Sequence, residues 1–484
     1  MSGACFALKF LDTILHGQSS WMARDGAHAL SVDDPATGAL IASLAITTKA
    51  QICAKIDQVS IAQALWAEMT ASARQNILRK WHDLAQKHEG ELAALLTLEQ
   101  GKPLSEAKAE ISSSLKNILW SAGLCERKNG YEEKSHINGA LNEVHYEPVG
   151  VVAAITPWNF PSAMITRKVA PALAAGCGVI LKPAEDTPLS AIALAKLAYD
   201  AGIPRGLFAL VITNREGAAE FSDVVFSDKR VRMVSFTGST AIGKTLIASS
   251  AQNVTKLSLE LGGNAPFIIC ADADLDKAVE GAFASKFRNA GQTCICANRI
   301  YVHADIYDVF MERFVARVRA AKIGNGFEDG VEIGPLINER AQQNVQNFIK
   351  KLDSEGAQKI YAAQPGLTWS FLPPMVYACA EDCSATQQEI FGPIACVYKF
   401  DSYEDVVQKA NETDYGLAAY IYAKDSKLST GLAKALQFGM VGINETRISD
   451  ASIPFGGVKQ SGIGREGGYD SLKNFMVTKF ICKA

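Results

Sequence analysis

The stretch Gly150-Val-Val-Ala-Ala-Ile-Thr156 decides the fold class of this 484-residue chain. It is an unbroken apolar run, and Pro161 then begins a helix pattern that continues to Ala175 and stops at Gly176. A second apolar run, Val179-Ile-Leu-Lys182, follows that helix. Continuous apolar strands that alternate with helices are typical of a parallel sheet covered on both faces, so we predict an α/β fold.

The same alternation runs through much of the chain. Residues 46–131 have apolar side chains at three- and four-residue spacing, which predicts several helices before the first strand. Further patterns indicate strands at 208–212, 231–236, 265–270 and 299–303, and helices at 190–201, 275–288 and 309–323. The chain therefore contains two successive α/β units, which meet near Glu260.

A hairpin pattern interrupts these units. Asn138-Gly139 lies between alternating flanks within residues 133–150, and Asn-Gly is a strong signal for a tight hairpin turn. The segment 475–482 indicates one more strand. Such a hairpin is either an arm that pairs with another subunit or a local surface feature, and the residues alone favour neither interpretation.

The composition excludes several classes of protein. A net charge of −3 excludes the basic surface of a nucleic-acid-binding protein. No apolar run approaches the roughly 20 residues that span a bilayer, and the first residues lack signal- or transit-peptide features. The 11 cysteines are an odd number without framework spacing, which suits a reducing compartment. We therefore expect a cytoplasmic protein with no nucleic-acid or membrane partner and no metal site.

One cysteine has the surroundings of a nucleophile. The stretch Phe287-Arg-Asn-Ala-Gly-Gln-Thr-Cys294-Ile-Cys296 follows an amphipathic helix and forms a polar turn. Glu260 lies 34 residues upstream, beside a Gly-Gly pair that suggests local flexibility. A thiolate that attacks a carbonyl and a carboxylate that activates water are the requirements of covalent catalysis. Most buried cysteines are packing residues, however, and the spacing alone leaves that interpretation of Cys294 open.

Two further segments suggest a cofactor site. Gly238-Ser239-Thr-Ala-Ile-Gly243 follows a strand and opens a helix, whose N-terminus can bind a pyrophosphate; an ordinary turn is the alternative. Lys182 and Glu185 follow another strand, at the sheet edge where α/β proteins bind ligands. Their side chains can bind ribose hydroxyls, or they form a solvated charge pair.

Together these segments resemble the aldehyde dehydrogenase superfamily. Seven motifs occur in the family's order and cover nearly all of the chain. They are Thr156-Pro-Trp-Asn159-Phe-Pro, Leu181-Lys182-Pro-Ala-Glu185, Phe236-Thr-Gly238-Ser239-Thr, Leu259-Glu260-Leu-Gly-Gly, Gly291-Gln-Thr-Cys294, Gln388-Glu389-Ile-Phe391-Gly-Pro and Pro454-Phe-Gly-Gly-Val-Lys459-Gln-Ser-Gly.

The resemblance implies roles for these residues. Cys294 would be the nucleophile, Glu260 the base and Asn159 the donor to the oxyanion, in a reaction that passes a hydride to NAD, with NADP as a second possibility. The low-pKa thiolate expected of such a nucleophile would also be the first thiol to oxidise. The resemblance implies cofactor contacts for Thr156, Trp158, Lys182, Glu185, Gly238, Ser239, Glu389 and Phe391.

A finer resemblance is to the succinate-semialdehyde dehydrogenases. Its marks are the segments 160–168, 285–296 and 460–467. It implies a small aldehyde substrate that carries a carboxylate, bound by Arg167 and Arg288 and, more weakly, by Ser449. It also implies a homodimer or homotetramer, and a reversible disulfide between Cys294 and Cys296, for which simple packing of Cys296 is the alternative.

The resemblance also implies a division into domains. We expect an NAD(P)-binding domain (1–132 and 151–259), a catalytic domain (260–442), an oligomerisation arm (133–150 and 466–484) and a returning loop (443–465). Three other functions stay open: oxidation of glutarate semialdehyde or a broader range of aldehydes, acyl transfer to coenzyme A, and a silent paralogue without turnover. The segments 212–215 and 361–375 depart from the family pattern.

Overall fold

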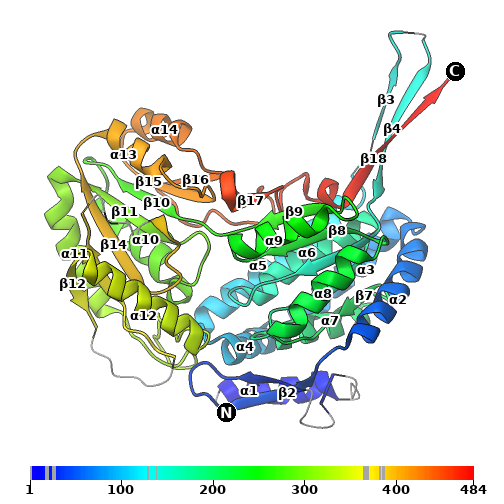
Figure 1. The fold of residues 1–484 in the computed structure, drawn as a ribbon, viewed down its shortest axis with the longest axis horizontal. Helices are drawn as coiled ribbons and strands as arrows, with labels where there is room; N and C mark the ends of the chain where they lie inside the picture. Colours follow the sequence, from blue (N-terminus) through cyan, green and yellow to red (C-terminus); the bar gives the residue numbers. More distant parts are fainter. Residues whose placement is uncertain are drawn as a thin grey trace.

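The computed structural model describes residues 3–16, 21–23, 29–127, 130–137, 139–363, 370–380, 383 and 387–484. It contains two α/β lobes side by side and a three-stranded arm that projects from one of them (Figure 1). The predicted α/β class is confirmed, because each lobe has a largely parallel sheet with helices around it.

The first lobe is built on a six-stranded sheet in the order β17-β9-β8-β5-β6-β7. Strands β5 to β9 are parallel, and the order reverses between β5 and β8. Open parallel sheets bind ligands at the carboxyl ends of the strands beside such a reversal. The strands are β5 (Val151–Ile155), β6 (Gly178–Lys182), β7 (Phe208–Leu210), β8 (Val231–Thr237), β9 (Lys256–Glu260) and β17 (Gly462–Ile463).

Both faces of this sheet are buried. Along β5, Val152 and Ala154 pack into the core on one face, whereas Val151 and Ala153 pack into the core on the other. This explains the unbroken apolar run in the sequence. The surrounding helices are α2 (Lys49–Ala67), α3 (Ala71–Lys87), α4 (Glu89–Gln100), α5 (Leu104–Leu124), α6 (Pro161–Ala175), α7 (Pro188–Asp200), α8 (Arg215–Ser227) and α9 (Thr240–Ser250).

Helix α6 matches the predicted helix. Pro161 occupies its first turn, and it ends at Gly176, whose φ of 96° is in the left-handed region that glycine adopts without a steric cost. Every residue of α6 is buried, including Arg167 and Lys168. Buried charges need partners, so the residues around these two cations must supply groups that stabilise them.

The second lobe contains a seven-stranded sheet in the order β12-β13-β14-β11-β10-β15-β16, in which only β12 is antiparallel to its neighbour. Its strands are β10 (Ala265–Ile269), β11 (Ala297–His303), β12 (Gln358–Ala362), β13 (Met375–Ala378), β14 (Ile394–Phe400), β15 (Ala418–Tyr422) and β16 (Met440–Ile443). Its helices are α10 (Leu275–Phe287), α11 (Tyr307–Ala320), α12 (Glu339–Ser354), α13 (Tyr403–Asn411) and α14 (Ser426–Ala435).

The arm consists of β3 (Tyr131–Lys134), β4 (Leu141–Pro148) and β18 (Met476–Lys483). All three strands are antiparallel, and β4 lies between the other two. The predicted hairpin and the predicted last strand are both confirmed. Gly139 has the left-handed φ of 73° that the turn requires, whereas Asn138 lies outside the described residues.

Some elements differ from the sequence pattern. Helix α1 (Gly3–Leu15), which packs on α4, and the hairpin of β1 (Ala29–Asp33) and β2 (Leu40–Ala45) were not predicted. Only part of the unusual segment 361–375 can be described, since residues 364–369 lie outside the described residues.

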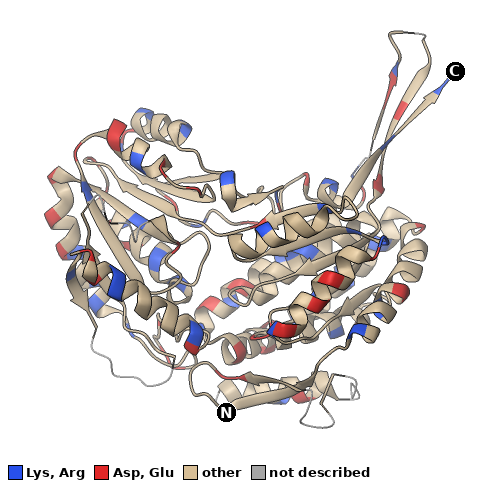
Figure 2. Cartoon of the chain, in the orientation of Figure 1, with Lys and Arg blue, Asp and Glu red and all other residues tan. Residues whose placement is uncertain are grey.

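Charged residues of both signs are interspersed over both lobes (Figure 2). Within the described ranges, no helix combines the length and the apolar character needed to cross a membrane.

Replacement of Trp66 should destabilise the first lobe. Its indole is 2% exposed and donates a hydrogen bond to the Leu173 carbonyl of α6 at 2.8 Å. We expect Trp66→Ala to cost about 3–5 kcal/mol, as large-to-small core substitutions do. The neighbouring Leu65 is 72% exposed, so Leu65→Ala is a matched control with little effect. Urea unfolding of the two variants checks this, and equal destabilisation would contradict it.

Candidate active site

The residues predicted to contact a cofactor gather at one edge of the first sheet. Thr156 and Trp158 follow β5, Lys182 ends β6, Gly238 follows β8 and Glu260 ends β9. This is the carboxyl edge beside the reversal of strand order, where doubly wound sheets bind ligands.

The polar groups at this edge fit a dinucleotide. Ser239 is exposed and caps α9 by accepting a hydrogen bond from the N–H of Ile242, at a helix N-terminus that favours phosphate. In the described part of the chain, the buried Thr156 hydroxyl has no hydrogen-bond partner. Lys182 and Glu185 form an ion pair at 3.7 Å, and burial lowers the pKa of Lys182.

Three further predicted residues line a cavity of about 280 Å³. The rings of Trp158 and Phe391 meet edge to face, with their centroids 5.6 Å apart. Glu389 accepts a hydrogen bond from the N–H of Gly263 at 3.1 Å, and burial raises the pKa of its carboxyl to about 7. The structure thus brings together the residues expected beside the nicotinamide and its ribose.

Cys294 follows a strained turn. The predicted helix that precedes it ends at Phe287, and Asn289, Ala290 and Gly291 then adopt left-handed φ angles of 52°, 54° and 75°. Such a conformation costs about 1–3 kcal/mol for each non-glycine residue, so surrounding contacts must hold the turn in place. The turn leaves Cys294 half-buried in the wall of a second cavity of about 280 Å³.

Glu260 lies on a segment that packs against this loop. A Cβ atom at Gly263 would lie 2.3 Å from the carbonyl oxygen of Cys294, so glycine at this position permits the close approach of the two segments. Glu260 is 2% exposed, and within the described residues neither of its carboxylate oxygens has a hydrogen-bond partner. Burial, and then the nearby Glu466, raise the pKa of Glu260 well above its ordinary value. A raised pKa is what a base near neutral pH needs.

Asn159 is held beside the Cys294 loop. Its side-chain Nδ2 donates to the carbonyl of Gln292 at 3.0 Å, and its Oδ1 accepts from the N–H of Phe160 at 3.1 Å. Its backbone carbonyl accepts a hydrogen bond from the Asn289 side chain at 2.9 Å. The Asn159 amide, the donor expected at an oxyanion, is therefore held against the carbonyl of Gln292, two residues before Cys294 in the chain.

The cavity of Cys294 also contains the predicted substrate residues. The Arg167 guanidinium lies over the ring of Phe455 at 4.6 Å and donates to the Ser449 hydroxyl at 2.9 Å. Among the described residues, its Nε and Nη1 are buried without a partner, and the Nε of Arg288 in the same wall is unpartnered too. Guanidinium N–H groups left unpaired in a cavity favour an anionic ligand.

Asp450 lines this cavity and is hydrogen-bonded within its own loop. Its carboxylate accepts hydrogen bonds from the N–H and the hydroxyl of Ser452, at 3.0 and 2.7 Å. The side-chain hydrogen bond from Ser452 is the main cause of the lowered pKa of Asp450. The carboxylate is therefore engaged by its own loop.

The expectation of a low-pKa thiolate at Cys294 was wrong. Burial, followed by the carboxylates of Glu389 and Glu260, raises the pKa of the thiol to about 12. Arg288 and Arg167 favour the thiolate but do not outweigh these effects. The sequence showed the polar residues of the turn but not the two carboxylates that the fold brings beside it. The thiol is therefore the resting form at neutral pH.

Cys296 is buried and is a free cysteine, as is Cys294. Its sulfur donates to the carbonyl of Lys286 at 3.5 Å, and burial raises its pKa. These contacts favour the packing interpretation, and the disulfide between the two residues stays a prediction.

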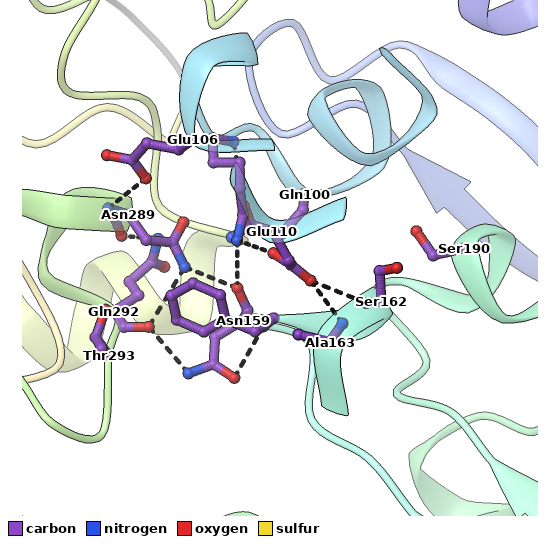
Figure 3. A network of polar contacts seen from close by, with 12 residues as sticks. Gln100, Glu106, Glu110, Asn159, Ser162, Ala163, Ser190, Asn289, Gln292 and Thr293 are labelled. Carbon is purple, nitrogen blue, oxygen red and sulfur yellow. Dashed lines mark hydrogen bonds and ion pairs between the residues drawn. The ribbon is translucent and has the colours of Figure 1, made fainter. Parts of the chain in front are cut away.

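Sequence analysis missed a polar network from the N-terminal helical region (Figure 3). Its members approach the loops of Asn159 and Cys294, although they precede them by 49 residues or more in the chain. The sequence pattern that could have revealed this network is three charged residues at four-residue spacing in a helical, largely apolar region. These residues are Lys102, Glu106 and Glu110, whose partners on the two loops include Asn159 and Asn289.

The departure at 212–215 has a local explanation. Thr213 is buried, and the Asn214 side chain accepts a hydrogen bond from the N–H of Gly217 at 2.9 Å. Asn214 thereby caps α8, which is a favourable use of asparagine at a helix N-terminus.

This fold and site define an aldehyde dehydrogenase: the chain belongs to the aldehyde dehydrogenase family, whose model matches residues 21–481. It is an NAD(P)-dependent oxidoreductase. It is similar to succinate-semialdehyde dehydrogenase [NADP(+)] of Escherichia coli, with 45% identity, and to glutarate-semialdehyde dehydrogenase of Pseudomonas aeruginosa, with 44%; each match covers 96% of both chains. The solved succinate-semialdehyde dehydrogenase of Burkholderia pseudomallei has a TM-score of 0.93 at 46% identity, over 96% of each chain.

The raised pKa of Glu260 predicts how the reaction depends on pH. Only the ionised carboxylate accepts a proton from water, so turnover limited by that step should rise with pH across a range above the ordinary carboxyl pKa. Glu260→Gln should retain a first-turnover burst of reduced cofactor and lose about 10²–10⁴-fold in steady-state rate. Stopped-flow absorbance between pH 6 and 9 measures both, and the absence of a burst would assign Glu260 a different role.

Proposed function

We propose that this aldehyde dehydrogenase oxidises a semialdehyde that carries a carboxylate, with succinate semialdehyde as the preferred substrate, to the dicarboxylic acid. The observation that carries this proposal is the buried Arg167 guanidinium with two unpaired N–H positions in the cavity of Cys294. Because an unpaired buried cation is costly, a substrate carboxylate is its natural partner. The names of the relatives from Escherichia coli and Burkholderia pseudomallei support this substrate.

The proposed chemistry begins at Cys294. The thiol releases its proton to solvent as the sulfur adds to the aldehyde carbon, and Arg288 and Arg167 favour the negative charge. Asn159 Nδ2 and the Cys294 N–H stabilise the oxyanion; loss of one such donor costs about 10²–10³-fold in rate. Bound NAD(P) supplies the hydride acceptor. Glu260 then removes a proton from the water that hydrolyses the thioester on Cys294 and releases the acid.

We propose a second candidate, glutarate semialdehyde, because a relative from Pseudomonas aeruginosa with this substrate in its name is 44% identical. The two substrates differ by one methylene, which a cavity discriminates by only about 10–200-fold. Initial rates with both substrates distinguish the candidates. Acyl transfer to coenzyme A is less well supported, since transfer to a thiol needs no water-activating base at Glu260.

For the cofactor we propose a preference for NAD over NADP. Glu185 would accept hydrogen bonds from the adenine-ribose hydroxyls and would repel a 2′-phosphate. It lies 3.7 Å from Lys182, whose ammonium would donate to the same ribose. We assign Gly238 and Ser239 to the pyrophosphate, and Thr156, Trp158, Glu389 and Phe391 to the nicotinamide half.

For the assembly we propose a cytoplasmic homodimer or homotetramer joined through the arm, whose exposed apolar side chains include Tyr131 and Phe480. We propose the domain boundaries given above on the basis of the three sheets. The six-stranded sheet belongs to the cofactor domain, the seven-stranded sheet to the catalytic domain and the three-stranded sheet to the arm.

Loss of either Arg167 or Arg288 should weaken the binding of an anionic aldehyde and leave the binding of a neutral aldehyde nearly unchanged. We expect Arg167→Ala and Arg288→Ala to raise KM for succinate semialdehyde about 10–100-fold, as loss of charged hydrogen bonds does, and to change KM for butanal little. Arg167→Lys keeps the charge without the planar fork and should give an intermediate KM. Cys294→Ala serves as the inactive control. Equal losses on both aldehydes would refute the carboxylate contact.

The charge of Glu185 should set the cofactor preference. We expect kcat/KM to be higher with NAD than with NADP, and Glu185→Gln to raise the value with NADP about tenfold by removing a like-charge repulsion. Initial rates with each cofactor at fixed aldehyde test this. A wild-type preference for NADP would overturn it.

A further inference from the structure

Three charged residues at four-residue spacing brace the two loops that form the candidate site. Lys102 precedes α5, and Glu106 and Glu110 lie one turn apart within it. Figure 3 shows the carboxylates of this helix directed toward the Asn159 loop and the Cys294 turn. Residues four apart on a helix share a face, so one stripe of α5 reaches both loops.

The Asn159 side of the site is held by Lys102 and Glu110. The Lys102 ammonium bonds to Glu110 at 2.5 Å and donates to the Asn159 carbonyl at 2.8 Å. The other oxygen of Glu110 accepts the N–H groups of Ser162 and Ala163, at 2.9 and 3.2 Å, in the first turn of α6. Lys102 and Glu110 thus hold the backbone on both sides of Phe160.

The Cys294 side depends on Glu106. Its Oε2 accepts the backbone N–H of Asn289 at 2.8 Å, at the first of the two strained left-handed residues before Cys294. Asn289 is 1% exposed, so Glu106 supplies an acceptor that water does not replace. The Asn289 side chain in turn donates to the carbonyl of Asn159, which joins the two loops.

Glu106 also acts on the substrate cavity. It is part of the cavity wall together with Arg288 and Cys294. Burial raises the pKa of Glu106 to about 7, and Lys102 and Arg288 favour its ionised form; the Nε of Arg288 is unpartnered within the described residues. A carboxylate that attracts Arg288 competes with a substrate carboxylate for the same guanidinium.

We propose that Glu106 is a positioning residue for the reaction: its bond to Asn289 sets the register of Cys294 against Asn159, and its charge sets how tightly Arg288 holds an anionic aldehyde. This rests on the proposed function, in which Cys294 is the nucleophile and Arg288 a carboxylate contact. If Glu106 had only a structural role, its replacement would lower stability. It would not change kcat and KM independently, and it would not affect anionic and neutral substrates differently.

The experiment compares Glu106→Gln with Glu106→Ala. The amide oxygen of glutamine accepts the same N–H without the charge, whereas alanine removes both. Ser105→Ala, at the exposed neighbour on α5, is the control and should match wild type. For each variant, kcat and KM are measured with succinate semialdehyde and butanal, together with the thermal midpoint and the rate at which iodoacetamide alkylates Cys294.

Glu106→Ala should lower kcat about tenfold or more on both aldehydes, because a misplaced nucleophile loses near-attack geometry. Glu106→Gln should keep kcat within about threefold of wild type while its KM falls severalfold for succinate semialdehyde and stays unchanged for butanal. The alkylation rate should change in the alanine variant and not in the glutamine variant.

Wild-type kinetics in Glu106→Ala, or an equal fall in kcat in both variants, would overturn the positioning role. An unchanged KM for succinate semialdehyde in Glu106→Gln would overturn the charge effect. If the alanine variant does not fold, the KM comparison in the glutamine variant still decides the charge effect, and Glu106→Asp, with its shorter reach, replaces alanine in the kcat comparison. Activity retained in Cys294→Ala would instead refute the proposed function, whatever the Glu106 variants show.

Discussion

The arrangement of the site depends on the contacts that the buried Lys102 ammonium group makes. It is fully enclosed, and it bonds to Glu110, donates to the Asn159 carbonyl and lies 3.9 Å from the centre of the Phe160 ring. Removal of one partner of a buried ion pair typically costs about 3–5 kcal/mol, so these contacts are made together or lost together. The helical layer before the sheet thereby fixes the loop after β5, and the position of the Asn159 amide follows from that constraint.

Helix α6 contains two buried cations that differ in how completely they are paired. Arg167 and Lys168 are adjacent and both are buried. The Lys168 ammonium is paired with Glu466, which arrives from the last part of the chain. Arg167 has one hydroxyl partner and two unpaired nitrogens, and it is part of the wall of the Cys294 cavity. An apolar helix carries a charge only at a cost, so the paired cation contributes to the fold, and the unpaired one is the cation that we propose binds the substrate carboxylate.

The sequence was sufficient wherever the information was local. The strand at 151–155, the helix from Pro161 to Gly176 and the hairpin around Gly139 depend on apolar runs and on backbone preferences of neighbouring residues. The motif residues could be assigned roles by resemblance, and the fold brings Arg167, Arg288 and Cys294 to one cavity.

What the sequence could not provide depends on distant pairs. The pKa of Cys294 is raised mainly by burial and by Glu389, which is 95 residues away in the chain, whereas the role expected of Cys294 implied a lowered pKa. The spacing of Glu106 and Glu110 indicated one helical face but not its partners, because periodicity identifies a face and not what packs against it. The strain at Asn289 and Ala290 had no signal, since neither residue type demands a left-handed conformation.

The short strand β17 has a consequence for how the protein is made. Gly462 pairs with Glu260, and the same returning segment delivers Glu466 to Lys168. These partners are separated by about 200 residues or more, so the sheet around the candidate base is synthesised long before the segment that completes it. A chain that ends before residue 462 would leave the edge of β9 without β17 and the Lys168 ammonium group without Glu466. The surroundings of the candidate base are therefore complete only after the last part of the chain has been synthesised.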